Sequence, residues 1–338
     1  MLTADVILAV WIICSLVFII TAFIDTYAIK IVHYLTIVTF YTLAGLRQKT
    51  FNSDTEVYYG HFESAQNQTF FEHHLLSRME PSWDTMTWLF AQFLSPSQSM
   101  FIVTLGAGLL LIYLFRITGL HPLTRCAVFV DFSFFGATSI IRFHYAFLLA
   151  ALALALISQD KKAKSTTALL ATATHYSAFP SVFYGLLRYF SLSTIALSAS
   201  ILTAFFLFSA DYIVYLIGRP ELVDPDNPVG TTMMRLVAYL TLALALCALA
   251  PQKTKTLTSS NPLASKIAII SIFAYIVVIS APPLVRVFII TSFSFYLIYD
   301  YLINNQKVFS IKKLIFWLFS VSMFIFFTIR QLYFYDLL

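Results

Sequence analysis

Residues 143–158 decide the class of this protein, and they read FHYAFLLAALALALIS. A helix needs roughly 20 predominantly apolar residues to cross a bilayer, with a range of about 17–25. Similar runs recur along the chain of 338 residues, in which 59% of the residues are hydrophobic and 11% are charged. A soluble domain carries about 25% charged residues and could not bury so much apolar surface. The composition therefore predicts a polytopic membrane protein and excludes a soluble enzyme and a disordered chain.

The apolar runs predict an all-α fold, because a backbone inside a bilayer has to satisfy its own hydrogen bonds. We expect one integral-membrane domain over 1–338, with about 10–12 transmembrane helices including a broken or re-entrant pair. The broken pair is 165–188, which His175 and Pro180 interrupt. The other predicted spans are 6–23, 31–46, 99–116, 126–141, 143–158, 192–210, 234–250, 266–282, 285–303 and 314–332.

The lysines predict the orientation of these spans through the positive-inside rule. Ten of the eleven lysines share one face if both termini lie outside and 165–188 enters the bilayer and returns. That face is then cytoplasmic, and only Lys49 lies on the other. We expect the first apolar run to remain as a helix, because no basic residue precedes it as in a cleaved signal peptide. The ten lysines are Lys30, Lys161, Lys162, Lys164, Lys253, Lys255, Lys266, Lys307, Lys312 and Lys313.

Arginine is distributed differently, since seven of the ten arginines fall on the outer side of this topology. A guanidinium binds phosphate oxygens bidentately and stays charged in a low dielectric, so a phosphate-bearing ligand would account for them. Arg142 and Arg286 lie within apolar sequence and are the candidate anion clamps of an outward-facing cavity. The structural alternatives are pairing with outer acidic residues and snorkelling to the interface.

Two long segments, 47–98 and 211–233, are expected as outer loops. The first should carry a short interfacial helix at 82–94, which is apolar but too short to span. Five potential metal ligands share this loop, but their spacing matches no metal signature, so we expect solvated histidines, no metal and no cofactor. The five are His61, Glu63, Glu72, His73 and His74.

His175 stands at the helix break, in the sequence Ala-Thr-His-Tyr-Ser-Ala-Phe-Pro. Broken helices at membrane depth are tolerated where they line protein or a water-filled cavity. We therefore predict that His175 is a site residue rather than a packing residue.

The order and spacing of these polar residues resemble those of EpsG-like proteins, which belong with the Wzy-type polysaccharide and O-antigen polymerases. The resemblance extends over residues 40–290, and Ser53 departs from it where many relatives place a small, Gly-like element. It is carried by Leu46-Arg47, Asp54, Tyr58, Phe62, Glu80-Pro81, Arg142 with Ala146, His175 with Ser177-Ala178, and Arg286.

The resemblance implies a glycosyltransferase-C-like enzyme of the bacterial inner (cytoplasmic) membrane, with its active site facing the periplasm or the cell exterior. Such polymerases are thought to transfer a growing glycan from undecaprenyl pyrophosphate to the next lipid-linked repeat unit of an O-antigen, capsule or exopolysaccharide. The implied partners are undecaprenyl-pyrophosphate-linked oligosaccharides and the lipid bilayer, with a chain-length regulator as a further candidate. Nucleic acid is not an expected partner.

This chemistry suggests roles for the matched residues. The candidates for base or acceptor positioning are His175, Asp54 and Glu80, and the histidine has the intrinsic pKa best suited to a base near neutrality. Three alternatives remain open: a polyprenyl-phosphate-dependent enzyme that adds a single sugar, a flippase for lipid-linked oligosaccharides, and an acyltransferase of surface sugars. The candidates for binding the pyrophosphate or a sugar are Arg142, Arg286, Arg47 and Tyr58.

Overall fold

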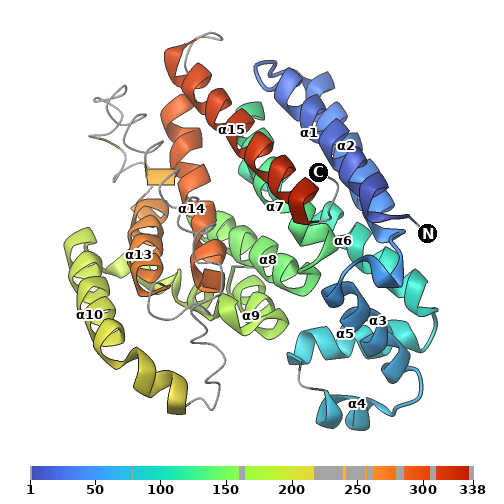
Figure 1. The fold of residues 1–338 in the computed structure, drawn as a ribbon. Helices are drawn as coiled ribbons and strands as arrows, with labels where there is room; N and C mark the ends of the chain where they lie inside the picture. Colours follow the sequence, from blue (N-terminus) through green and yellow to red (C-terminus); the bar gives the residue numbers. More distant parts are fainter. Residues whose placement is uncertain are drawn as a thin grey trace. The chain divides into compact units, whose positions relative to one another are not determined.

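The computed structural model describes residues 2–77, 79–159, 164–216, 239–240, 256, 262–278, 285–304 and 310–334. Within these ranges the regular elements are helices, and the expectation of an all-α protein is confirmed (Figure 1). The predicted span 234–250 lies outside the described residues except for 239–240, so the total of 10–12 spans stays a prediction. Five described helices are long and apolar enough to cross a membrane: α1 (Ala4–Thr21), α2 (Tyr27–Gly45), α6 (Pro96–Thr118), α8 (Ile141–Ser158) and α15 (Ile311–Phe334).

The chain forms two compact units. Unit 1 comprises Met1–Leu149, Ala173–Tyr176 and Gln306–Leu338, and unit 2 comprises Ala150–Thr172 and Ser177–Asn305. The expectation of a single integral-membrane domain over 1–338 stays a prediction.

The helical bundle of unit 1 consists of α1, α2, α6, α15 and the shorter α7 (Pro122–Thr138), which pack against one another. Aromatic rings from different helices pack against one another inside the bundle. Trp11 of α1 is fully buried, with its ring 5.4 Å from that of Phe134 and 5.6 Å from that of Phe324. The indole Nε1 of Trp317 donates to the carbonyl of Ile19 at 3.0 Å, so that α15 is tied to α1 by a polar contact as well.

Several basic residues lie at one end of this bundle, and the lysine pattern predicts that two of them lie on the same side of the membrane. Asp25, in the turn between α1 and α2, lies 3.6 Å from Nζ of Lys30 and 3.8 Å from Nη2 of Arg125. His121 precedes α7, where burial and the nearby charge of Lys313 lower its pKa to about 4. Lys30 and Lys313 therefore share one end of unit 1, as the lysine pattern predicts, and Arg125 lies with them. The side of the membrane that this end faces stays a prediction.

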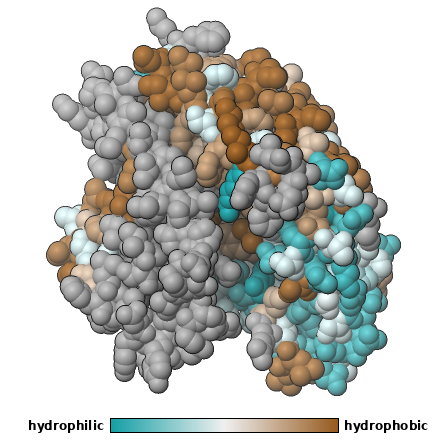
Figure 2. Space-filling model, in the orientation of Figure 1, coloured by the Kyte–Doolittle hydropathy of each residue, from teal (hydrophilic) through white to brown (hydrophobic). Residues whose placement is uncertain are grey.

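A 3₁₀ helix, η1 (Lys49–Phe51), and three α-helices precede α6 in the segment 47–98, where the sequence predicts a loop with one short helix. Each α-helix begins at a local start signal: Asn52 accepts a hydrogen bond from the N–H of Thr55, Thr69 and Glu72 form a capping box, and Pro81 occupies a first turn. All three are shorter than the roughly 20 residues that a spanning helix needs. Their polar faces also lower the mean hydropathy of the segment, so it does not resemble a span in sequence. They carry the hydrophilic surface at the lower right of Figure 2. They are α3 (Ser53–Ala65), α4 (Phe70–Leu76) and α5 (Pro81–Ala91).

The helix break predicted at His175 is present. Helix α9 (Lys164–Thr174) ends immediately before His175, and two 3₁₀ segments follow, η2 (Tyr176–Phe183) and η3 (Leu186–Tyr189). The sequence predicts an α-helix in their place. Pro180 lies inside η2, and a proline cannot donate to an α-helical hydrogen-bond ladder. The hydroxyl of Ser181 donates to the carbonyl of Ala168 at 3.3 Å, so the chain turns back alongside α9.

Unit 2 also contains α10 (Leu192–Leu216), α13 (Pro262–Val278) and α14 (Val285–Ile303), with α13 packed against the other two. Nζ of Lys266 donates to the carbonyls of Leu187 and Arg188 at 2.9 and 3.3 Å. Lys266 therefore lies beside the segment that contains Arg188. Helix α10 continues through residues 211–216, where a loop is expected, and residues 217–233 lie outside the described part of the chain.

Candidate functional site

A cluster of buried apolar residues joins α3, α5, α6 and the start of α8, and it positions the candidate site. The rings of Tyr58 and Trp83 lie 5.3 Å apart at its centre. Ile141 belongs to the cluster and immediately precedes Arg142, so its burial fixes the point from which the arginine side chain extends. The cluster consists of Tyr58, Tyr59, Phe62, Trp83, Met100, Val103 and Ile141.

Glu80 connects three parts of unit 1 through its carboxylate. The residue is 6% exposed and precedes α5 as its N-cap. Its Oε2 lies 2.7 Å from Nη1 of Arg142, the second residue of α8. Its Oε1 accepts a hydrogen bond from the backbone N–H of Tyr176 at 3.3 Å and lies 3.8 Å from Nδ1 of His175. Three residues predicted from the sequence, Glu80, Arg142 and His175, are thereby brought together.

His175 is buried at the helix break, with 5% of its surface exposed. The ring of Phe143 meets its imidazole edge to face, with the centroids 5.4 Å apart. A carboxylate beside Nδ1 favours a proton on that nitrogen. Nε2 is then the basic nitrogen of the neutral ring, which is the state that a general base requires.

Tyr58 lies beside Arg142, whereas Asp54 is exposed in the first turn of α3. Burial raises the pKa of Tyr58 to about 12. The charge of Arg142 and a hydrogen bond with the backbone of Arg142 lower this pKa, but by less than burial raises it. The phenol is therefore neutral at physiological pH. It supports the arginine through packing, and Asp54 is exposed to solvent.

Arg47 is fully buried, and its guanidinium is engaged within the protein. Nη1 donates to the carbonyl of Ala44 at 2.9 Å and to the hydroxyl of Thr104 at 3.1 Å, while Nε donates to the hydroxyl of Thr55 at 3.1 Å. These contacts join the end of α2 to α3 and α6. The geometry favours a role in holding these helices rather than in binding a ligand. Arg286 lies in the first turn of α14, and its side chain is outside the described part of the structure.

A cavity of about 300 Å³ opens beside Arg142. The arginine side chain is 19% exposed, so part of its guanidinium remains accessible even though it pairs with Glu80. An anionic group that enters the cavity can therefore reach this cation. Residues that line the cavity include His61, Gln68, His73, Ser77, Met79 and Arg142.

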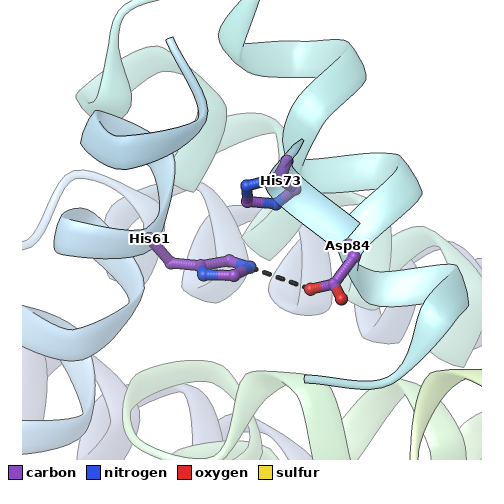
Figure 3. Close-up of side chains that lie close together, drawn as sticks. All are labelled: His61, His73 and Asp84. Carbon is purple, nitrogen blue, oxygen red and sulfur yellow. Dashed lines mark hydrogen bonds and ion pairs between the residues drawn. The ribbon is translucent and has the colours of Figure 1, made fainter. Parts of the chain in front are cut away.

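A second polar group lies at this cavity, and Figure 3 shows its three side chains. Nε2 of His61 is 3.1 Å from Oδ1 of Asp84, and potential ligand atoms of His61, His73 and Asp84 all lie within 4.8 Å of one another. Burial raises the pKa of Asp84, but hydrogen bonds from His61 and Ser77 outweigh it and hold this pKa below its usual value. The expectation of solvated histidines is wrong for His73, which is 1% exposed because α4 packs against α5. Asp84 was missed, because its approach to the histidines depends on how α5 packs against α3 and α4.

The long apolar helices, the break at His175 and the polar group around Glu80 define a multi-pass membrane protein with a built polar site. The chain belongs to the EpsG family, whose model matches residues 30–337, and the resemblance seen in the sequence is thereby confirmed. This family is implicated in exopolysaccharide biosynthesis. No curated protein and no solved structure significantly matches the chain.

Proposed function

We propose that this protein is a polysaccharide polymerase of the inner membrane. It transfers a growing glycan from undecaprenyl pyrophosphate to the next lipid-linked repeat unit, at a site that faces the periplasm or the cell exterior. The observation that carries the proposal is the junction at Glu80, where one carboxylate contacts both Arg142 and the segment containing His175. Membership of the EpsG family supports the same reaction class.

In this proposal Arg142 binds the pyrophosphate of the donor. Negative charge develops on the departing pyrophosphate as the glycosidic bond breaks, and a guanidinium that is already oriented stabilises it without reorganisation. Glu80 supplies this orientation through its 2.7 Å contact with Nη1, so Glu80 is a positioning residue. Arg286 remains a second candidate for this pyrophosphate, on the strength of the family resemblance.

His175 is proposed as the general base. Nε2 accepts the proton of the acceptor hydroxyl while that oxygen forms a bond to the anomeric carbon and the bond to pyrophosphate breaks. The carboxylate of Glu80 beside Nδ1 stabilises the imidazolium that results. Asp54, which is exposed on α3, is proposed to contact sugar hydroxyls.

Deletion of the gene, followed by gel analysis of the surface polysaccharide, tests this function. If the protein is a polymerase, the deletion strain should retain single repeat units and lose the ladder. The wild-type gene should restore the ladder. Loss of one sugar from every repeat would identify a single-sugar transferase instead. Accumulation of repeat units on the cytoplasmic side would identify a flippase.

A further inference from the structure

We propose that His61, His73 and Asp84 form a binding site for a divalent transition-metal ion, with Zn²⁺ as the best-matched ion. One residue comes from each of the three short helices, α3, α4 and α5 (Figure 3). Two imidazoles and a carboxylate are ligands of open zinc sites, in which the fourth position is left to water or substrate. This inference does not depend on the proposed polymerase reaction.

The spacing of the ligand atoms suits an ion. A tetrahedral ion with bonds of about 2.0–2.1 Å sets its ligand atoms about 3.3 Å apart. His61 and Asp84 already lie 3.1 Å apart, and no pair in the group exceeds 4.8 Å. The widest separation has to close by about 1.5 Å at most, which rotation of a side chain can provide.

His73 supplies an independent indication that a ligand belongs here. The residue is 1% exposed, and its Nε2 is a buried atom with no hydrogen-bond partner among the described residues. Its Nδ1 lies 3.0 Å from Oε1 of Gln68, which can only accept a hydrogen bond. The proton therefore resides on Nδ1, and Nε2 presents a lone pair. A buried acceptor without a partner is costly, whereas a metal ion would satisfy it.

The surroundings also resemble the support that metal ligands receive in proteins. Metal-ligating histidines usually donate their second N–H to a carbonyl or carboxylate, as His73 donates to Gln68. Ligating carboxylates are in turn hydrogen-bonded, and the hydroxyl of Ser77 donates to Oδ1 of Asp84 at 2.7 Å. Imidazole ligands favour zinc and its transition-metal neighbours over Mg²⁺ and Ca²⁺, which prefer oxygen.

The site faces the same cavity as Arg142, because His61, His73 and Arg142 all line it. A bound ion would therefore direct its open coordination position into a space that already contains a guanidinium. The ligand class expected at that position is an anionic oxygen, such as that of a phosphate or a carboxylate.

Metal binding by the purified full-length protein tests the inference. The protein is prepared in detergent without a histidine tag, stripped with a chelator and titrated with Zn²⁺, and bound metal is measured by mass spectrometry. Co²⁺ is titrated in parallel, because its visible absorption reports the ligand geometry. The inference predicts one saturable ion per chain and a rise in the thermal midpoint, since an ion that binds the folded state stabilises it.

Variants locate the ion. His73→Gln and Asp84→Asn are expected to abolish saturable binding, and Gln68→Ala to weaken it by about 10–100-fold. His74→Gln is the matched control, because His74 lies on the same helix but bonds Phe70 and Thr85. Each variant is checked for monodisperse elution. Failure of the wild-type protein to bind Zn²⁺, or full binding by the His73→Gln and Asp84→Asn variants, would overturn the inference. The wild-type titration decides the question even if a variant does not fold.

Discussion

Oε2 of Glu80 lies 2.7 Å from Nη1 of Arg142, and the two residues begin different helices of the same unit. Glu80 is buried, whereas Arg142 retains 19% exposure toward a cavity. Buried ion pairs contribute little net stability, because desolvation offsets their attraction. Their value lies in geometry, and here the carboxylate fixes one edge of the guanidinium and leaves the rest accessible to an anion.

Replacing Glu80 by Gln should lower activity while the protein still accumulates. The amide can still accept from the N–H of Tyr176, but it no longer provides the charge that orients Arg142 and His175. Residues that belong to one salt-bridge network are coupled by about 0.5–3 kcal/mol, which corresponds to a loss of about 2–150-fold in rate. The measurement is polysaccharide formed per amount of membrane protein. Glu56→Gln, an exposed change on α3, is the control, and equal activity of the two variants would refute the positioning role.

His175→Asn should reduce the rate of transfer by about 10²–10⁴-fold, the usual contribution of general base catalysis. The smaller amide fits the buried pocket but cannot accept a proton at neutral pH. Turnover in membranes with lipid-linked substrate measures the effect, and substrate binding should change little. A variant that retains the wild-type rate would exclude His175 as the base.

Removing the charge of Arg47 should affect folding rather than chemistry. Arg47→Met leaves the hydroxyls of Thr55 and Thr104 without their buried donor, and each hydrogen bond to a charged group contributes about 1.5–3 kcal/mol. Lys49→Met is the matched control, because Lys49 pairs with Glu63 on an exposed surface, where a pair contributes about 0–1 kcal/mol. Thermal unfolding in detergent should show a large shift for the first variant and a small one for the second. A stable but inactive Arg47→Met protein would instead favour a role in binding pyrophosphate.

The packing of α7 against α8 should not tolerate a methyl group at Gly136. A Cβ at this position would overlap the imidazole of His144, which a 2.7 Å hydrogen bond to the hydroxyl of Tyr41 holds in place. Overpacking of this kind costs about 1–3 kcal/mol, so Gly136→Ala should lower the thermal midpoint. Gly60→Ala meets no atom within 4 Å and should be neutral or stabilising by about 0.5–1 kcal/mol. Equal midpoints for the two variants would contradict the close approach of these helices.

The break at His175 was predictable from one local cause and from one pattern that extends over the whole chain. Pro180 cannot continue an α-helical ladder, and the lysine pattern requires the chain to return to its starting face. The three helices within 47–98 were harder to foresee, although Thr69, Glu72 and Pro81 are start signals. Their amphipathic stretches are short, and short helices depend on tertiary packing for their stability.

The predicted site residues have different roles in the structure. The contacts that decide these roles come from distant parts of the chain and cannot be predicted from the local sequence. Arg47 and Arg142 were both predicted to bind the pyrophosphate or a sugar. Arg47 is buried because Thr55 and Thr104 come from other helices to meet it, whereas Arg142 meets Glu80 at the edge of a cavity. Asp84 was missed for the same reason, since its relation to His61 depends on the packing of α5 against α3.

The most direct test of the central claim is polymerisation by the purified protein in lipid vesicles, supplied with undecaprenyl-pyrophosphate-linked repeat units. Products are resolved on a gel for the wild type, Arg142→Lys and Arg330→Lys. Lysine keeps the charge but lacks the planar two-donor fork, and Arg330, whose guanidinium lies 5.1 Å from the ring of Phe135, serves as the control. We expect a ladder from the wild type and from Arg330→Lys, and almost none from Arg142→Lys at equal amounts of protein. A full ladder from Arg142→Lys, or no ladder from folded wild-type protein, would contradict it.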